Sequence, residues 1–119
     1  MKVKKKNLVT ASIVIGILII AAIVIYSNAK AVGEELVPRE IAKCIGGNST
    51  MYSQTGCHYC KQQKDMFGSS VKYLNIIECD YSPALCNSLG IQRTPTWIIK
   101  GIKYEGVQSV EKLQNLTGC

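Results

Sequence analysis

The chain has 119 residues, enough for one small domain besides any membrane segment. Its six cysteines are many for so short a protein and indicate an oxidising compartment. The formal net charge is +6, but four lysines among the first six residues supply most of it. The rest of the chain mixes basic and acidic residues, so its composition argues against a nucleic-acid-binding protein.

The N-terminal region has the composition of a membrane anchor. Residues 1–7 form a lysine-rich leader, and residues 8–26 carry no charge and are mostly Ile, Val, Leu and Ala. A helix of that length is about 28 Å long, close to a hydrocarbon core of about 30 Å. The flanking charges predict a cytosolic leader and a domain outside the cytosol, in a periplasm, an extracellular space or a lumen. Residues 27–35 are then predicted to be a linker, and residues 36–119 the domain.

A cleavable signal peptide is the alternative to an anchor. Its apolar region usually has only about 7–15 residues, fewer than the run found here. However, Ala29-Lys30-Ala31 matches a signal-peptidase pattern at a suitable distance. We expect an uncleaved anchor, and both alternatives place the domain outside the cytosol.

Glycines, prolines and hydrophobic patterns divide the domain into alternating helices and strands. Helices are predicted from Pro38 to the glycines at 46–47, over 57–67, over 84–89 and over 110–116. Strands are predicted over 49–53, 71–79, 96–99 and 102–105, the last two joined as a tight hairpin. The strand over 71–79 is expected to be buried.

A C-x-x-C pair, Cys57 and Cys60, lies where the first predicted strand leads into a helix. Free backbone N–H groups and the helix dipole stabilise a thiolate at Cys57, and thiolates are the nucleophiles of disulfide exchange. The spacing lets Cys60 fold back and resolve a mixed disulfide. Protonated His58, and more weakly Lys61 and Lys64, would add positive charge that favours the thiolate.

Two other interpretations of the pair are an inert structural disulfide and half of a metal site. A zinc site needs two further ligands, usually a second C-x-x-C or a histidine pair. The single histidine lies inside the motif, and no second close cysteine pair exists. The sequence therefore predicts a redox-active disulfide, with no metal and no other bound cofactor.

A β-α-β unit with C-x-x-C at its first helix, followed by Thr-Pro and a hairpin, resembles the thioredoxin fold. This α/β fold has a central mixed four-stranded sheet flanked by helices, here preceded by one transmembrane helix. The resemblance implies that Pro95 is cis and faces the active-site disulfide, and that Thr94 contacts the substrate. We also expect His58 and Tyr59, between the two cysteines, to support the active site.

Several stretches resemble one subgroup more narrowly, namely the thioredoxin-like domains fused to, or partnered with, bacterial and plant homologues of vitamin K epoxide reductase. These stretches are Met51-Tyr52, residues 60–68, Glu78-Cys79-Asp80, Ala84-Leu85-Cys86, residues 95–99 and residues 104–107. The resemblance implies re-oxidation of the domain by a quinone-linked membrane protein. Since one apolar segment cannot form a quinone-binding unit, that partner would be a separate polypeptide.

The other four cysteines are assigned only through this resemblance. The subgroup carries cysteines near Cys79 and Cys86, which flank a turn, so we expect a local disulfide between them. Cys44 and Cys119 are then left to tether the two ends of the fold. Six cysteines permit 15 connectivities, and a redox relay through Cys79 and Cys86 stays an alternative.

The sequence thus predicts a membrane-anchored thiol–disulfide oxidoreductase that acts on client proteins with thiols or disulfides. We expect net oxidation of clients, with an exported reductase or isomerase as the alternative. A non-catalytic module that binds metal or clients is the alternative from another class. The motif lacks the Trp and Pro of thioredoxin, and Met51 replaces its buried acid, so the direction of electron flow stays open.

Overall fold

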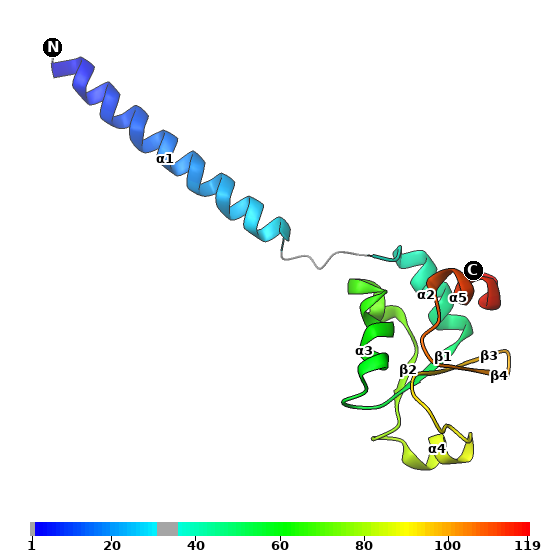
Figure 1. Ribbon diagram of the computed structural model, residues 1–119. Coiled ribbons are helices and arrows are strands. Elements are labelled where there is room, and N and C mark those ends of the chain that lie inside the picture. The colour runs from blue at the N-terminus through cyan, green and yellow to red at the C-terminus, as the bar shows by residue number, and fades with distance from the viewer. Residues whose placement is uncertain (1, 31–35) are drawn as a thin grey trace. The chain divides into compact units, whose positions relative to one another are not determined.

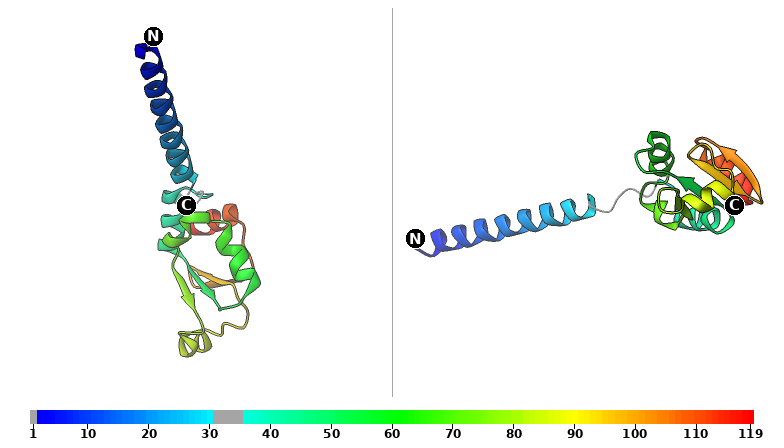
Figure 2. Two further views of the ribbon diagram at one scale, coloured as in Figure 1. Left: turned by 90° about the vertical axis from the view of Figure 1, so that its left-hand side faces the viewer. Right: turned by 90° about the horizontal axis from the view of Figure 1, so that it is seen from below.

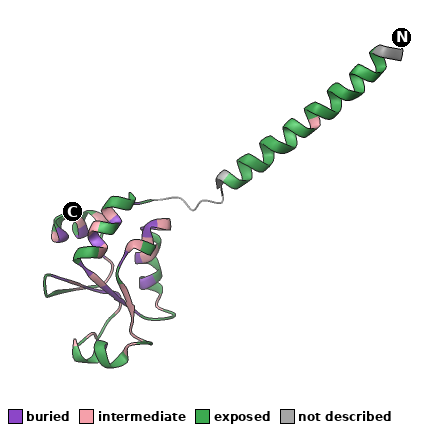
Figure 3. Ribbon diagram, turned by 180° about the vertical axis from the view of Figure 1, so that it is seen from behind, coloured by how far each residue is buried: buried purple, intermediate pink, exposed green. Residues whose placement is uncertain are grey.

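The computed structural model describes residues 2–30 and 36–119 (Figure 1). These form two separate units, the helix α1 (Lys2–Lys30) and a domain made of all later elements. Within the described residues, α1 provides the one helix that is long and apolar enough to cross a membrane, with a mean hydropathy of 3.1 over its best stretch. A signal sequence would have the same properties. Figure 3 shows that α1 is exposed along nearly its whole length, so it is no core helix.

Helix α1 extends beyond the predicted apolar segment at both ends. The leader from Lys2 and the first part of the predicted linker, to Lys30, are helical as well. No Pro or Gly interrupts either extension, and the Ser27 hydroxyl donates to the Val24 carbonyl oxygen at 3.0 Å, within the helix. The predicted linker was therefore too long at its start. Its remainder, residues 31–35, which includes Ala31 of the cleavage pattern, lies outside the described residues.

The domain is built on one four-stranded sheet in the order β2-β1-β3-β4. The strands are β1 (Thr50–Ser53), β2 (Ile76–Glu78), β3 (Thr96–Ile99) and β4 (Ile102–Glu105). β1 and β2 are parallel, with Met51 opposite Ile76, whereas β1–β3 and β3–β4 are antiparallel. The parallel pair requires a crossover, which α3 and η1 supply.

Helices surround this sheet and bury the domain core. They are α2 (Arg39–Asn48), α3 (His58–Asp65), the 3₁₀ helix η1 (Gly68–Tyr73), α4 (Pro83–Ser88) and α5 (Val110–Thr117). The largest buried apolar side chains are those of Trp97, Phe67, Ile45, Met51, Ile99 and Leu113. Figures 1 and 2 show α4 on the opposite side of the domain from α2 and α5. The mixed sheet, the α3 crossover and the C-terminal hairpin give a thioredoxin-like fold.

The predicted strand over 71–79 was wrong in its first half. Residues up to Tyr73 belong to η1, because Gly68 at φ 55° ends the α3 region and the Leu74 N–H donates to the Val71 carbonyl. The buried Ser70 hydroxyl also donates to the Val37 carbonyl at 2.6 Å, which holds η1 against the segment before α2. β2 is consequently short, and as an edge strand it is half-buried rather than buried.

The glycine pair at the end of α2 does not stop the helix, contrary to the prediction. Gly46 lies inside α2 where the helix approaches η1, and a Cβ there would overlap the Tyr73 carbonyl oxygen. The glycine is therefore required by close packing. α2 continues to Asn48, whose amide donates to the Cys44 carbonyl at 2.8 Å.

Candidate active site

The C-x-x-C pair begins at a tight turn between β1 and α3. Gly56 has φ +76°, in the left-handed region that favours glycine, and the Cys57 N–H donates to the Gln54 carbonyl at 3.2 Å. Cys57 is the N-cap residue of α3, and its carbonyl accepts from the Lys61 N–H at 3.1 Å. This sulfur therefore lies at the N-terminal end of a helix, as the sequence predicted.

The two sulfurs differ in their environment. Cys57 and Cys60 form a disulfide with Cα atoms 5.2 Å apart. The Cys57 Sγ accepts the Cys60 N–H at 3.1 Å and is half-buried, whereas Cys60 is 1% exposed. The Cys60 N–H has no partner within the helix and can stabilise negative charge on the Cys57 sulfur, and an attacking thiolate reaches this sulfur more readily.

The Thr94-Pro95 segment lies against the same sulfur. The peptide bond between these residues is cis, and Pro95 is buried. The Thr94 carbonyl oxygen lies 3.4 Å from the Cys57 Sγ, and its hydroxyl donates to that sulfur, also at 3.4 Å. Thr94 is thus brought to the disulfide, although it lies 37 residues after Cys57 in the chain, and Pro95 follows it directly.

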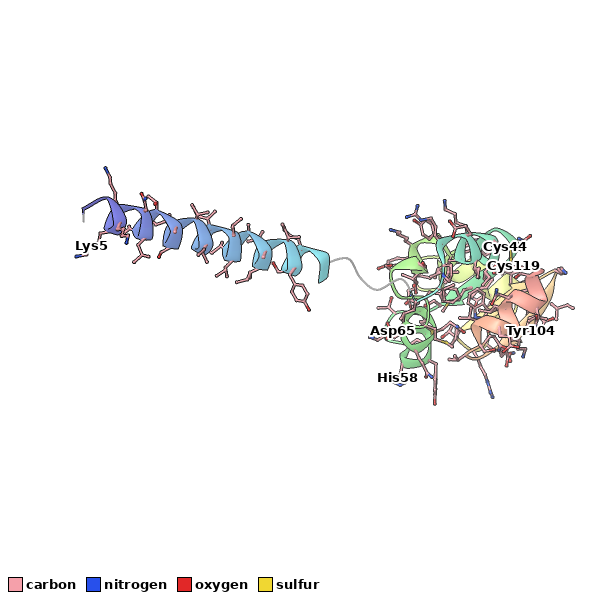
Figure 4. The ribbon with its side chains drawn as sticks, turned by 90° about the horizontal axis from the view of Figure 1, so that it is seen from above. Lys5, Cys44, His58, Asp65, Tyr104 and Cys119 are labelled. Carbon is pink, nitrogen blue, oxygen red and sulfur yellow. A yellow bond between two sulfur atoms is a disulfide. The ribbon has the colours of Figure 1, made fainter. Side chains whose placement is uncertain are left out.

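His58 and Tyr59 are both exposed at the start of α3, and Figure 4 labels His58 there. Their rings contact each other edge to face, with centroids 5.6 Å apart. Tyr59 is 62% exposed, so it offers an aromatic surface beside the disulfide.

The lysines of α3 contribute less positive charge than the sequence suggested. Lys61 pairs with Asp65 at 2.5 Å, and Lys64 pairs with Glu78 of β2 at 2.6 Å. Each lysine charge is therefore compensated locally. The electrostatic stabilisation of a Cys57 thiolate falls mainly to the helix N-terminus.

Two clefts open beside the disulfide. One of about 690 Å³ is lined by both cysteines and by charged groups that include Lys64 and Glu78. The other, of about 500 Å³, is lined by Tyr59, Thr94 and Gly106, among others. Both volumes lie in the range of ligand-sized clefts.

A buried amide network behind the pair was missed by sequence reasoning. Gln63 is fully buried, and its Oε1 accepts from the Trp97 indole N–H at 3.0 Å and from the Gln108 backbone N–H at 2.7 Å. Its Nε2 donates to the Gln108 carbonyl at 2.9 Å. The sequence does contain a signal for this network, because Cys60, Gln63 and Phe67 are spaced so that they share one face of the predicted helix. A polar residue on that face indicates a satisfied buried network.

Asp80 belongs to one of the stretches that carry the family resemblance, but the sequence predicted no role for it. Its carboxylate accepts the Thr55 N–H at 2.6 Å, which ties the turn after β2 to the loop that precedes Cys57. Hydrogen bonds from the Thr55 backbone, then from the Thr55 and Gln54 side chains, lower the pKa of Asp80 below its ordinary value of 3.8. This carboxylate helps to fix the loop that positions Cys57.

The other four cysteines form two disulfides. Cys79 pairs with Cys86, and Cys44 on α2 pairs with Cys119 at the C-terminus (Figure 4). Their Cα separations are 5.7 and 5.9 Å. In the part of the chain that the structure describes, no three His, Cys, Asp or Glu residues gather in a way that could hold a metal ion.

Comparisons with known proteins point to the same chemistry. No family model matches the chain. It is 34% identical over 77 residues to the thiol-disulfide oxidoreductase LTO1 of Arabidopsis thaliana, an alignment that covers 57% of this chain. The chain spans about 20% of the length of that relative. It thus resembles part of a thiol-disulfide oxidoreductase.

Two solved structures are similar over about two thirds of the chain. A domain of the alkylhydroperoxide reductase AhpF from Enterococcus faecalis has a TM-score of 0.42 and 16% identity, covering 67% of this chain and 44% of that one. A protein disulfide oxidoreductase from Aeropyrum pernix has a TM-score of 0.43 and 19% identity, covering 66% and 40%.

Proposed function

We propose that the chain is a membrane-anchored thiol–disulfide oxidoreductase that exchanges disulfides with client proteins through Cys57 and Cys60. The observation that carries this proposal is the asymmetry of the pair. The Cys57 sulfur accepts a helix N–H and contacts Thr94, while Cys60 is buried behind it. The similarity to a thiol-disulfide oxidoreductase over 77 residues supports the same chemistry.

In client oxidation, a client thiolate attacks the Cys57 sulfur and the Cys57–Cys60 bond breaks. The Cys60 sulfur leaves as a thiolate and takes up a proton, and a mixed disulfide joins Cys57 to the client. A second client thiolate then attacks the client sulfur of that bond and releases Cys57 as a thiolate. The client loses two electrons and the domain gains them. Reduction of a client follows the same steps in reverse.

Thr94 would hold the client during this exchange. Its carbonyl and hydroxyl lie beside the Cys57 sulfur, and it also lines the smaller cleft with Tyr59. An extended client segment in that cleft can hydrogen-bond to the Thr94 backbone, which requires no particular client sequence. This arrangement suits an enzyme with many clients.

Trapping of mixed disulfides tests the roles of the two sulfurs. In Cys60→Ala, the resolving thiol is gone, so mixed disulfides with clients should accumulate through Cys57. Cys57→Ala is the matched control and should trap few, because Cys60 is buried. Preferential trapping by Cys57→Ala would reverse the assignment, and trapping by neither would remove the proposed activity.

The direction of electron flow follows from the reduction potential of the pair. A value near about −120 mV would give an oxidant of clients, and one near about −270 mV a reductant. We propose the oxidising direction. A stabilised Cys57 thiolate favours the reduced form of the pair, and the N–H bond to Cys57 supplies such stabilisation.

We further propose that a separate quinone-linked membrane protein, similar to vitamin K epoxide reductase, re-oxidises the pair. The motif resemblance supports this partner, and an anchored α1 would raise the effective concentration of one membrane-bound thiol near another. The domain should become reduced in membranes stripped of quinone and stay oxidised in intact ones. Equal oxidation in both would argue for a soluble oxidant.

A further inference from the structure

Three cations surround one tyrosine on the surface formed by α2 and η1. The Lys43 and Lys72 ammonium groups each lie 5.2 Å from the centre of the Tyr73 ring, and the Arg39 guanidinium lies 5.9 Å from it. We call these four residues the α2–η1 basic patch. Cations over an aromatic face attract it but keep their charge, so the patch remains positive.

The cations of the patch differ from Lys61 and Lys64, the two lysines of α3, which are both paired with carboxylates. Among residues 2–30 and 36–119, the ion pairs are Lys61–Asp65 and Lys64–Glu78, so no cation of the patch lies within 4 Å of a carboxylate of these residues. Of the described acids, Glu40 on α2 is the nearest in sequence, and the three cations of the patch exceed it in charge, whereas Glu34 and Glu35 lie outside the described residues. Three converging cations without a carboxylate indicate a partner that carries negative charge.

We propose that the α2–η1 basic patch binds the anionic headgroups of a lipid bilayer. The inference rests on the proposed anchoring of α1. Arg39 lies nine residues after Lys30, and nine residues span at most about 30 Å even when fully extended. The patch can therefore reach the surface in which α1 would be inserted.

This docking would orient the active site. Cys57 caps the start of α3, whereas η1 follows the end of this eight-residue helix, which is about 12 Å long. The disulfide and the patch thus lie at different ends of α3. With the patch on lipid, the C-x-x-C end of α3 would lie further from the lipid than η1, where soluble clients and the extramembrane part of a membrane-bound partner can both reach it.

Lysine acylation of the full chain in lipid nanodiscs tests the docking. One set of discs contains phosphatidylcholine alone, and the other also contains phosphatidylglycerol. Mass spectrometry gives the acylation rates of Lys43 and Lys72, with Lys100 and Lys112 as internal controls. Each juxtamembrane cation raises the affinity for an anionic surface about fivefold. The rates at Lys43 and Lys72 should therefore fall at least about fivefold in the anionic discs, with Lys100 and Lys112 unchanged.

High salt and a pair of variants show whether the protection depends on the charge of the patch. At about 1 M salt the Debye length is only about 3 Å, so the protection should disappear. Arg39→Gln should weaken it about fivefold, and Lys103→Gln, a matched loss of one cation on β4, should leave it unchanged. Equal rates in the two kinds of disc would overturn the proposal. So would protection by soluble polyglutamate but not by anionic lipid, which would assign the patch to an acidic protein.

The same discs separate this inference from the proposed function. A chain that enters neither kind of disc disproves the anchor. A chain that enters both, traps clients as Cys60→Ala, and shows equal lysine rates disproves the patch alone.

Discussion

Gln63 is a single side chain that joins α3 to two later parts of the fold. Its Oε1 accepts from both the Trp97 indole and the Gln108 backbone, and all of these groups are buried. Because it lies three residues after Cys60 on the same helix, it also supports the backbone that carries the buried sulfur.

We expect Gln63→Leu to lower the free energy of unfolding by about 2–6 kcal/mol. It leaves two buried donors without an acceptor, each at a cost of about 1–3 kcal/mol. Gln62→Leu is the matched control on the exposed neighbour and should change stability by less than about 0.5 kcal/mol. Urea unfolding with the disulfides intact measures both. Equal effects of the two substitutions would mean that the network contributes little.

The Asp80 carboxylate should make stability depend on acidic pH. Because hydrogen bonds hold its pKa below 3.8 in the folded state, its contribution is present above the unfolded pKa and is lost as pH falls through the folded pKa. In Asp80→Asn, the melting temperature should therefore fall less steeply below about pH 4 than in the unmodified chain. Parallel melting curves from neutral pH to about pH 2 would contradict this role.

The roles of some residues could be predicted from the sequence, and those of others could not. Cys57 and Cys60 were found because their spacing and helix position are local. The bond of Asp80 to Thr55 joins residues 25 apart, and no local pattern shows which donor a carboxylate will meet. The role of Thr94 came only through the resemblance, for the same reason.

At the scale of elements, the β3–β4 hairpin shows a local conflict between residue type and backbone. Lys100 has φ 52° and Gly101 has φ 77°, the successive positive values of a type I′ turn. Glycine adopts such angles freely, but a lysine in this region is disfavoured by about 1–2 kcal/mol.

We expect Lys100→Asn to raise the free energy of unfolding by up to about 1 kcal/mol, because asparagine tolerates this conformation. Lys103→Asn removes the same charge from the middle of β4 and is the control. It should be neutral or destabilising, since asparagine is disfavoured in strands. Thermal unfolding separates them, and a lower melting temperature for Lys100→Asn would refute the turn assignment.

The helices and strands were largely predictable where nearby turn residues and hydrophobic periodicity mark their ends. β3, β4 and α5 follow from a Pro, a Lys-Gly turn and a three-residue periodicity, and they were found within one residue of the predicted positions. The conversion of residues 71–73 from strand to η1 was not predictable. It depends on the distant Ser70–Val37 bond and on the close approach of Gly46 to Tyr73, which only the folded chain provides.

At the scale of the whole molecule, the two disulfides outside the motif close loops of very different length. Cys44–Cys119 closes a span of 75 residues, whereas Cys79–Cys86 closes one of 7. In the chain-entropy account, the longer loop restricts the unfolded chain more.

Cys44→Ser/Cys119→Ser should lower the free energy of unfolding by about 2–5 kcal/mol, and Cys79→Ser/Cys86→Ser by less. Both variants should still trap clients when combined with Cys60→Ala, because neither pair contains the attacking sulfur. Loss of trapping in a well-folded Cys79→Ser/Cys86→Ser variant would indicate a redox relay instead. Denaturant unfolding and client trapping are the two measurements.

The Cys44–Cys119 bond also decides how the domain responds to mechanical load. A pull between residue 36 and the C-terminus enters α2 and passes through this bond, which bypasses the 75-residue span between the two cysteines. Only the few residues before Cys44 can lengthen under tension. In single-molecule stretching, the oxidised domain should therefore yield almost no extension. A reducing agent that cleaves this bond should release about 250 Å of chain, at about 3.3–3.6 Å per residue. Chemical reduction, rather than force alone, would then control when the domain extends.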